Sequence, residues 1–226
     1  MTTSGTTSFS PTVQDIIEEA AERAGYEIRD GYGLRTAIRS LNFLAAEWAS
    51  RGLNLFTIDQ QTITTIIGQT AYTLPADTID AIEVVWSQNY NTPQRLDISM
   101  ERYSVSQWAQ FAIKNAPGPP YAYWIQRLDD APIMNVWFQP DQAYTISYWR
   151  LRRIQDAGTV SNTMDMPFRF IPALVAGLAY QLSTKHKGSE QRVAPLQAAY
   201  EAAFQLAADE DRDRASVFFL PYSDTY

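Results

Sequence analysis

Cysteine is absent from this chain of 226 residues, and histidine occurs only once. Without cysteine the protein has no disulfides, no thiolate metal sites and no cysteine nucleophile. The single histidine, His186, stands in "TKHKG" at the end of an expected helix, where a cation complements the helix dipole. No serine is spaced to form a nucleophile beside it. The sequence therefore predicts that the protein is not an enzyme.

Positive charge and long apolar runs are also scarce. There are 18 Lys and Arg against 25 Asp and Glu, a net charge of −7. This excess of negative charge argues against sequence-independent binding of nucleic acid, which needs clustered positive charge. No apolar run approaches the ~20 residues of a membrane span. The opening "MTTSGTTSFS" lacks the basic and apolar regions of a secretory signal. We expect a soluble protein, made in the cytoplasm and without a membrane partner.

Motifs that bind cofactors are missing as well. "RDGYGLR" has two glycines, but no strand precedes it as a phosphate-binding loop requires. No residues have metal-ligand spacing. In "ADEDRDR", the pairs Asp209–Arg212 and Glu210–Arg214 have the spacing of ion pairs on a solvated helix. The sequence therefore predicts neither a cofactor nor a metal.

Apolar residues recur at helical spacing near the N-terminus. Two stripes span residues 13–24 and 34–49, and Gly25 and Gly52 follow them as helix stops. Thr12, with an acid three residues on, resembles a capping pair. The spacing predicts two amphipathic helices.

The same spacing returns towards the C-terminus. Stripes span residues 170–182 and 193–207, with Gly188 as a break between them. Ser189 is expected to cap the last helix, and Pro195 either delays its start or bends it. Because two amphipathic helices cannot bury both of their stripes alone, the four helices are expected to form one bundle.

The segment between the helices carries strand patterns. "FTIDQQTITTI" is rich in β-branched residues, and "AYTLPADTIDAIEVVW" has the form of strand, turn and strand. "PIMNVWFQP" and "AYTISYWRL" alternate in the manner of further strands, and "MERYSVSQWAQFAI" suits a short helix. These patterns predict a small β domain inserted into the bundle, for which a sandwich is a suitable arrangement.

The predicted fold class is α+β: a discontinuous four-helix bundle with an inserted small antiparallel β domain and an extended C-terminal tail. The expected parts are a flexible N-terminus at 1–10, a bundle formed by 11–53 and 165–212, a β insertion at 54–164 and a tail at 213–226.

Large aromatic side chains are concentrated in the strand region. Most are expected to fill the β core, and the excess suits a protein interface. Exposed on one sheet face they would instead stack on sugars, which gives a carbohydrate-binding module as the alternative function. They are Tyr90, Trp108, Tyr121, Tyr123, Trp124, Trp137, Tyr144, Tyr148 and Trp149.

The one basic cluster, "YWRLRR" at 148–153, lies at a strand end. In an acidic chain it suits a subunit contact or a solvated edge better than a nucleic-acid site. The candidate inter-subunit contacts are Trp137, Trp149, Arg150, Arg152 and Arg153.

Four segments together resemble a known family. They are "LRTAIRSLNFLAAEWASRGLNLFTI", "TAYTLPADTIDAIEVVW", "NVWFQPDQAYTISYWRLR" and the last helix running into "ADEDRDRASVFFLPY". In order and content they are similar to the head-to-tail adaptor proteins of short-tailed bacteriophages, also called head-completion or tail accessory proteins. The resemblance covers the chain from about residue 11 to its end.

The resemblance implies a structural protein of the virion, assembled in the host cytoplasm and lying at the head–tail junction. Such adaptors form a ring, typically of twelve subunits, beneath the portal protein. They extend the channel through which duplex DNA passes, without sequence-specific binding, and they support a tail hub or nozzle protein.

The resemblance also implies a role for the apolar end "ASVFFLPYSDTY". In the adaptors this segment is extended and docks against the portal. The expected docking residues are Val217, Phe218, Phe219, Leu220, Tyr222 and Tyr226. The alternative is that the segment folds back over its own helices.

Overall fold

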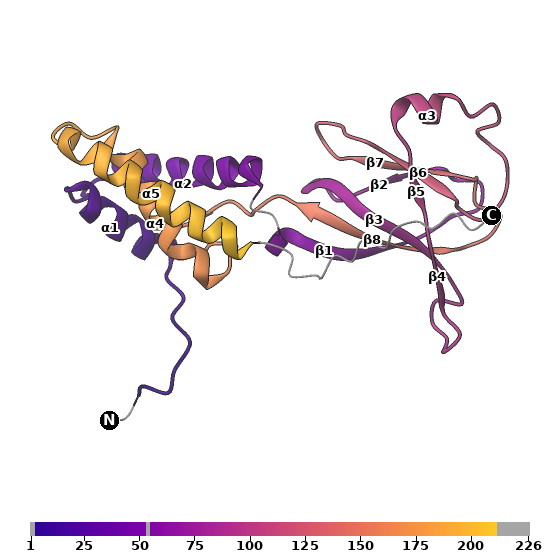
Figure 1. Cartoon of the computed structure of the whole chain (residues 1–226), viewed down its shortest axis with the longest axis horizontal. Helices are drawn as coiled ribbons and strands as arrows, with labels where there is room; N and C mark the ends of the chain where they lie inside the picture. The colour runs from indigo at the N-terminus through magenta and orange to yellow at the C-terminus, as the bar shows by residue number, and fades with distance from the viewer. Residues whose placement is uncertain (1–2, 53–54, 212–226) are drawn as a thin grey trace, which may run out of the picture. The chain divides into compact units, whose positions relative to one another are not determined.

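The computed structural model describes residues 3–52 and 55–211 (Figure 1). It divides into two compact units. One is helical and combines the chain up to Phe56 with the chain from Gln155 onwards, and the other consists of residues 57–154. The four long helices lie in the first unit, the strands lie in the second, and nearly all the strand pairs are antiparallel, so the predicted α+β class is confirmed.

The helical unit is organised around one central helix. Helix α4 (Ile171–Ser183) contacts the other three long helices, which are α1 (Val13–Ala24), α2 (Gly31–Arg51) and α5 (Glu190–Glu210). It is apolar on nearly all sides, as expected of a helix surrounded by others. Figure 1 shows α5 running alongside α4 in this unit.

A glycine allows the helices to approach closely. A Cβ atom added to Gly177 of α4 would lie 2.8 Å from both Leu44 Cδ2 and Tyr200 Cε2. The missing side chain therefore lets α2 and α5 pack directly on the α4 backbone. The core here is rich in alanine, leucine and isoleucine, with Trp48 and Phe170 as its largest fully buried side chains.

The predicted caps of the N-terminal helices are confirmed. Thr12 and Asp15 form a reciprocal capping box at the start of α1, and Gly25 ends that helix with a φ of 93°. Gly52 ends α2 with the same φ. The prediction for α5 was wrong, because Ser189 donates its hydroxyl to Ala24 O at 2.7 Å and makes no side-chain cap. Pro195 lies inside α5 and does not delay its start.

Residues 155–164 belong to the helical unit, so the β domain ends ten residues earlier than predicted. The carbonyls of Asn162 and Val160 accept the backbone N–H groups of Val13 and Gln14 at 2.8 and 3.0 Å. These N–H groups have no partner within their own helix, since they belong to its first turn. The segment therefore serves as a backbone cap for α1. Its irregular sequence has no pattern that predicts this role.

The β unit contains two four-stranded sheets. The first sheet has the order β1 (Ile58–Thr64), β8 (Thr145–Arg152), β3 (Thr78–Gln88) and β4 (Leu96–Ser99). The second has the order β2 (Ala71–Thr73), β7 (Ile133–Trp137), β6 (Ala122–Gln126) and β5 (Glu101–Arg102). Side chains from both sheets form one buried core, which makes the unit a sandwich.

Strands β2 and β3 are not a hairpin, although the sequence between them has a turn pattern. Leu74 donates its backbone N–H to Pro132 O at 2.9 Å, which keeps β2 beside the chain that enters β7. The connection through Pro75 then crosses to the other sheet, where β3 pairs with β8 and β4. Turn residues therefore marked where the chain bends but not which strands it joins.

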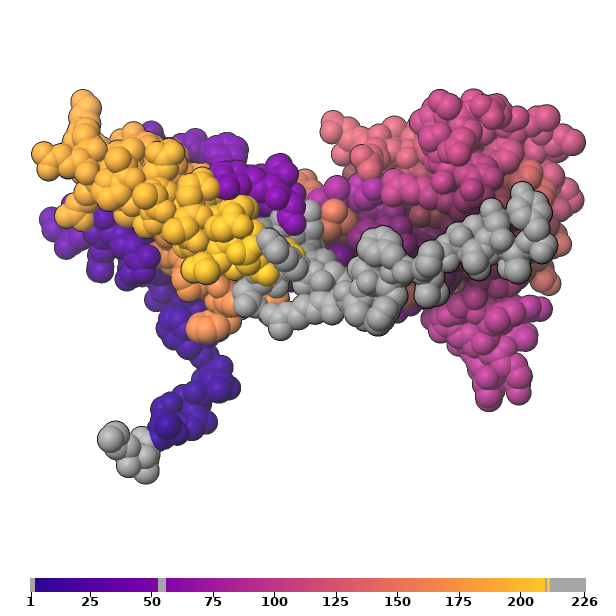
Figure 2. All heavy atoms as spheres, in the orientation of Figure 1, coloured from indigo at the N-terminus to yellow at the C-terminus, as the bar shows by residue number. Residues whose placement is uncertain are grey.

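Two further features lie outside the sandwich core. The turn joining β3 to β4 projects from the β unit, as Figure 2 shows in magenta. There the Arg95 guanidinium lies 4.5 Å from the Tyr90 ring centre and binds Asp97 through two nitrogens. The predicted short helix is α3 (Val105–Ala109), with Ser104 and Gln107 forming its capping box.

Candidate interaction surfaces

The outer face of the second sheet carries a cluster of stacked aromatic rings, which we call the outer aromatic cluster. Phe111 follows α3 and stacks on Trp137 of β7 with ring centres 4.1 Å apart. Phe138 stacks on the same indole at 3.8 Å. Because two near-parallel rings cannot share one side of Trp137, each of its faces is covered. The cluster consists of Tyr103, Trp108, Phe111, Tyr121, Trp124, Trp137 and Phe138.

This stacking bears on the carbohydrate alternative. A sugar ring binds against an open aromatic face, whereas Trp137 has a ring on each side and donates its Nε1 hydrogen to Ile113 O at 3.0 Å. At the edge of the cluster, Tyr103 and Tyr121 both donate their hydroxyls to Glu101 Oε2, at 3.0 and 2.9 Å. Burial, followed by this carboxylate, raises the pKa of Tyr103 to about 12. The covered faces of Trp137 therefore do not offer a stacking platform for a sugar.

The basic strand end is divided between the inside and the outside of the β unit. Arg150 is buried and donates to Asp59 and Thr78 Oγ1, each at 2.8 Å, and also to both carboxylate oxygens of Asp77. Arg153 is exposed. Arg150 therefore joins β1, β3 and β8, and its guanidinium is occupied within its own subunit. Although burial opposes ionisation of Asp59, hydrogen bonds from Arg150 and Gln61 hold the pKa of this carboxyl below its usual range.

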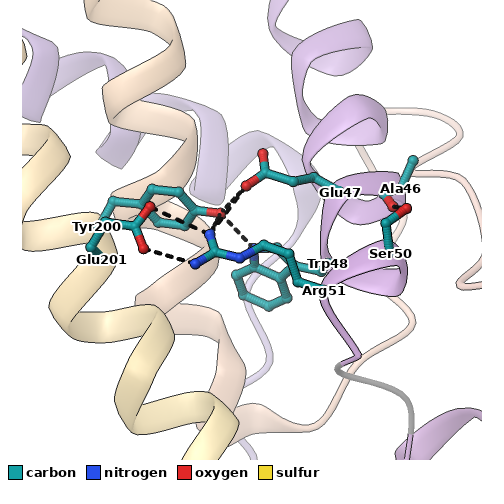
Figure 3. A network of polar contacts seen from close by, with 7 residues as sticks. All are labelled: Ala46, Glu47, Trp48, Ser50, Arg51, Tyr200 and Glu201. Atoms are coloured by element: carbon teal, nitrogen blue, oxygen red, sulfur yellow. Dashed lines mark hydrogen bonds and ion pairs between the residues drawn. The ribbon is translucent and has the colours of Figure 1, made fainter.

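A second polar network fastens α2 to α5 in the helical unit (Figure 3). Arg51, in the last turn of α2, binds Glu201 at 2.8 Å and lies 3.6 Å from the Phe204 ring centre. The Tyr200 hydroxyl donates to Glu47 at 2.9 Å and accepts the Trp48 Nε1 hydrogen at 3.1 Å. Burial raises the pKa of Tyr200 to about 12.

These groups are bound to one another by the hydrogen bonds and the ion pair just described. The hydrogen bonds that Arg51 donates to Glu201 raise the pKa of Arg51, so this residue keeps its positive charge. The network holds the end of α2 in place just before the chain leaves for the β unit. Its role is to stabilise the helical unit.

An apolar groove of about 380 Å³ lies between α1 and α4. Phe9 and Phe168 meet edge to face at its rim, with ring centres 6.1 Å apart and 72% and 64% of each residue exposed. The sequence placed Phe9 in a flexible N-terminus, so this contact was missed. Elsewhere in the chain that the structure describes, no three His, Asp or Glu side chains gather as a metal site.

The structure places the predicted contact residues in different surroundings. Trp137 belongs to the outer aromatic cluster, whereas half-buried Trp149 lies on the first sheet between Gln60 and Glu83. Arg150 is internal, and Arg152 donates to the backbone oxygen of Arg153 at 3.2 Å. Nothing here tests a subunit contact at these positions, which stays a prediction.

The predicted docking residues from Val217 to Tyr226 lie outside the described residues. Within the described part, none of the helices combines the length and apolar content needed to cross a bilayer.

Comparison with known proteins decides the family. The family model of the SU10 adaptor protein matches residues 11–220, which include both units and most of the segment after α5. The chain belongs to the SU10 adaptor protein family. This confirms the resemblance to phage head-to-tail adaptors and makes the protein a structural adaptor of a phage particle. A search of curated proteins found no match.

Proposed function

We propose that this SU10-family adaptor forms a ring beneath the portal, extends the DNA channel and connects the head to the next tail component at the head–tail junction. The ring has twelve subunits, and the four long helices of each subunit act as one bundle. The observation that carries the proposal is the family match over residues 11–220.

The acidic balance supports a channel. With a net charge of −7, a ring of copies carries a large excess of negative charge. Acidic side chains facing the lumen repel phosphate, so duplex DNA slides through without binding. The aromatic and basic residues Trp137, Trp149, Arg152 and Arg153 are proposed as contacts between subunits or with the tail hub, with Arg150 supporting them from inside.

Attachment to the portal is assigned to the segment after α5. Its residues Val217, Phe218, Phe219, Leu220, Tyr222 and Tyr226 are rich in apolar surface. Burial of one such side chain in a partner contributes about 1.5–3 kcal/mol before ordering costs. Because every subunit of a ring repeats the contact, modest affinities add up to durable attachment.

Mixing the purified chain with purified portal rings tests this function. We expect the chain alone to elute as a monomer or small oligomer, and portal and chain to elute together. Negative-stain averages of that peak should show a second ring of twelve subunits on the portal. If the two proteins elute separately at micromolar concentrations, the proposed function is wrong.

A further inference from the structure

The two edge strands of the first sheet, β1 and β4, have backbone groups on opposite sides of this sheet that no other described residue binds. In the order β1-β8-β3-β4, every neighbouring pair is antiparallel, and among the described residues β1 pairs only with β8 and β4 only with β3. Edges of this kind are templates for another strand. The β1 segment "IDQQTIT" contains no lysine and no proline, and its pairing with β8 has no bulge, so it lacks three common protections of an edge strand.

Hydrogen bonds at the strand ends show which residues face each open edge. Thr65 donates its N–H to Tyr144 O at 2.8 Å, directly beyond the paired residues Thr64 and Thr145. Backbone groups alternate in direction along a strand, so those of Ile63 and Gln61 also face β8. The N–H and C=O groups of Thr62 and Thr64 therefore face outward.

The same argument applies to β4. Met100 donates its N–H to Val84 O at 2.9 Å, directly beyond the pair Ser99 and Val85. The backbone groups of Asp97 and Ser99 consequently face the other open edge. Each edge strand of the first sheet thus has two residues whose outward backbone groups no other described residue binds.

The two edges are complementary between copies. β1 and β4 run in opposite directions within the sheet, so β4 of a neighbour with the same orientation would pair antiparallel with β1. One register matches both the hydrogen bonds and the side chains: Thr62 opposite Ser99, and Thr64 opposite Asp97. It places Ile63 opposite Ile98, and both of these isoleucines are only partly buried where they flank the sandwich core.

From this complementarity we infer that neighbouring subunits join by pairing β1 of one copy with β4 of the next in the register Thr62–Ser99. The contact uses different surfaces on the two copies, as a ring with many subunits requires. It covers the exposed parts of Ile63 and Ile98 together and continues the outer polar face of one sheet into the next. The inference rests on the proposed ring, but it makes a separate claim about how that ring is built.

Engineered cysteines test the register directly, because the natural chain has no cysteine. In the double variant Thr62→Cys/Ser99→Cys, both positions are exposed. Within one copy the two strands are separated by three strand spacings, about 14 Å, which is too far for a disulfide. Opposite each other across a subunit boundary, the Cα atoms would lie about 5.5 Å apart, within disulfide range.

After mild oxidation on the portal, we expect this double variant to give a ladder of covalent oligomers up to the full ring on a denaturing gel. Thr62→Cys alone and the out-of-register pair Thr62→Cys/Asp97→Cys are the controls and should give little product. A covalent dimer from Thr62→Cys alone would overturn the inference, since it would mean that two β1 strands pair about a two-fold axis.

A backbone variant separates strand pairing from side-chain contact. Thr62→Pro removes an outward N–H, which an edge strand tolerates, and it should raise the midpoint concentration for ring assembly by about tenfold or more. Thr62→Val keeps the N–H and should assemble normally. Hydrogen exchange of the monomers checks that both variants remain folded.

The outcomes separate this inference from the proposed function. If rings form on the portal but neither the double-cysteine ladder nor the proline effect appears, the strand pairing is wrong and the ring stands. If wild-type chain forms no ring with the portal, both are wrong.

Discussion

The two units of this adaptor each bury an apolar core, but the residues that form and hold the two cores differ. The helical unit brings together two segments that are far apart in sequence, and it uses small residues such as Gly177 so that helices meet closely around α4. The β unit is one continuous segment whose core contains tyrosine and tryptophan and whose strands are linked by arginine–aspartate ion pairs. The ion pair of the helical unit, Arg51–Glu201, is partly exposed, whereas the arginine that links the strands of the β unit, Arg150, is buried. The helical unit therefore depends mainly on close apolar contact, and the β unit depends in addition on a buried ion-pair network.

The largest expected effect is the loss of Trp48 from the helical unit. This side chain is fully buried, packs on Phe204 and donates to Tyr200. Trp48→Ala should lower the free energy of unfolding by about 3–5 kcal/mol, because the cavity is surrounded by helices that cannot all close on it. Urea unfolding followed by helical ellipticity measures the change.

Phe43→Ala is the matched control, since Phe43 lies on the same helix and is 62% exposed. Its effect should stay within about 0.5 kcal/mol. Hydrogen exchange by mass spectrometry should show faster exchange in α1, α2, α4 and α5 of Trp48→Ala and unchanged exchange in the sandwich. Equally faster hydrogen exchange in both units of Trp48→Ala would contradict the conclusion that the two cores are separate.

A smaller effect is expected in the β unit from Arg150→Met. This substitution leaves Asp59 and Asp77 facing each other without the cation that binds them. Removing one partner of a buried pair typically costs about 3–5 kcal/mol. Here the carboxylates are 34% and 47% exposed, and solvent screening should reduce the loss to about 1–3 kcal/mol.

Unfolding of the β unit, followed by exchange in β1, β3 and β8, is the measurement. Arg153→Met is the control because Arg153 is exposed at the end of the same basic run, and it should change stability by less than about 0.5 kcal/mol. If the two variants behave alike, Arg150 does not hold the three strands together.

The smallest expected effect concerns Tyr200. Tyr200→Phe removes the acceptor of the Trp48 Nε1 hydrogen and the donor to Glu47, and should cost about 1–2 kcal/mol at neutral pH. Tyr180→Phe, on α4 and outside this network, is the matched control.

The same hydroxyl predicts a dependence on alkaline pH. The folded pKa of Tyr200 is about 12, while an unfolded tyrosine has a pKa of about 10. Because the unfolded chain loses this proton first, the stabilisation is complete below about pH 10 and is lost as the pH rises towards 12. Unfolding free energies measured between pH 9 and 11 should fall less steeply in Tyr200→Phe than in wild type. Identical slopes would contradict the placement of this hydroxyl.

The sequence predicted the helices better than the sheets. A helical stripe is a local pattern, so residues 13–24 and the capping pair at Thr12 could be assigned without knowing what they pack against. Strand alternation located β1, β3 and β8 but did not specify their partners, because pairing is non-local. The cap that residues 155–164 provide for α1 was missed for the same reason.

The candidate surfaces show the same division. Arg150 follows Ile146 and Tyr148 on the inward side of β8, so its burial could have been predicted from the alternation that identified the strand. The outer aromatic cluster could not, since it depends on how the chain around Phe111 folds back over Trp137. Composition alone indicated an excess of aromatic residues without showing which rings stack on each other.

The most direct measurement is a titration of portal rings with wild-type chain and with the variant Phe218→Ser/Phe219→Ser, read by mass photometry. Both described units should be unaffected by the variant, and Asp224→Asn serves as the matched control in the same segment. Losing two buried phenylalanines should weaken each contact by about a hundredfold or more, so we predict that wild type and the control saturate the portal and the double variant does not bind at micromolar concentrations. If the double variant saturates the portal as wild type does, the segment after α5 is not what attaches this adaptor.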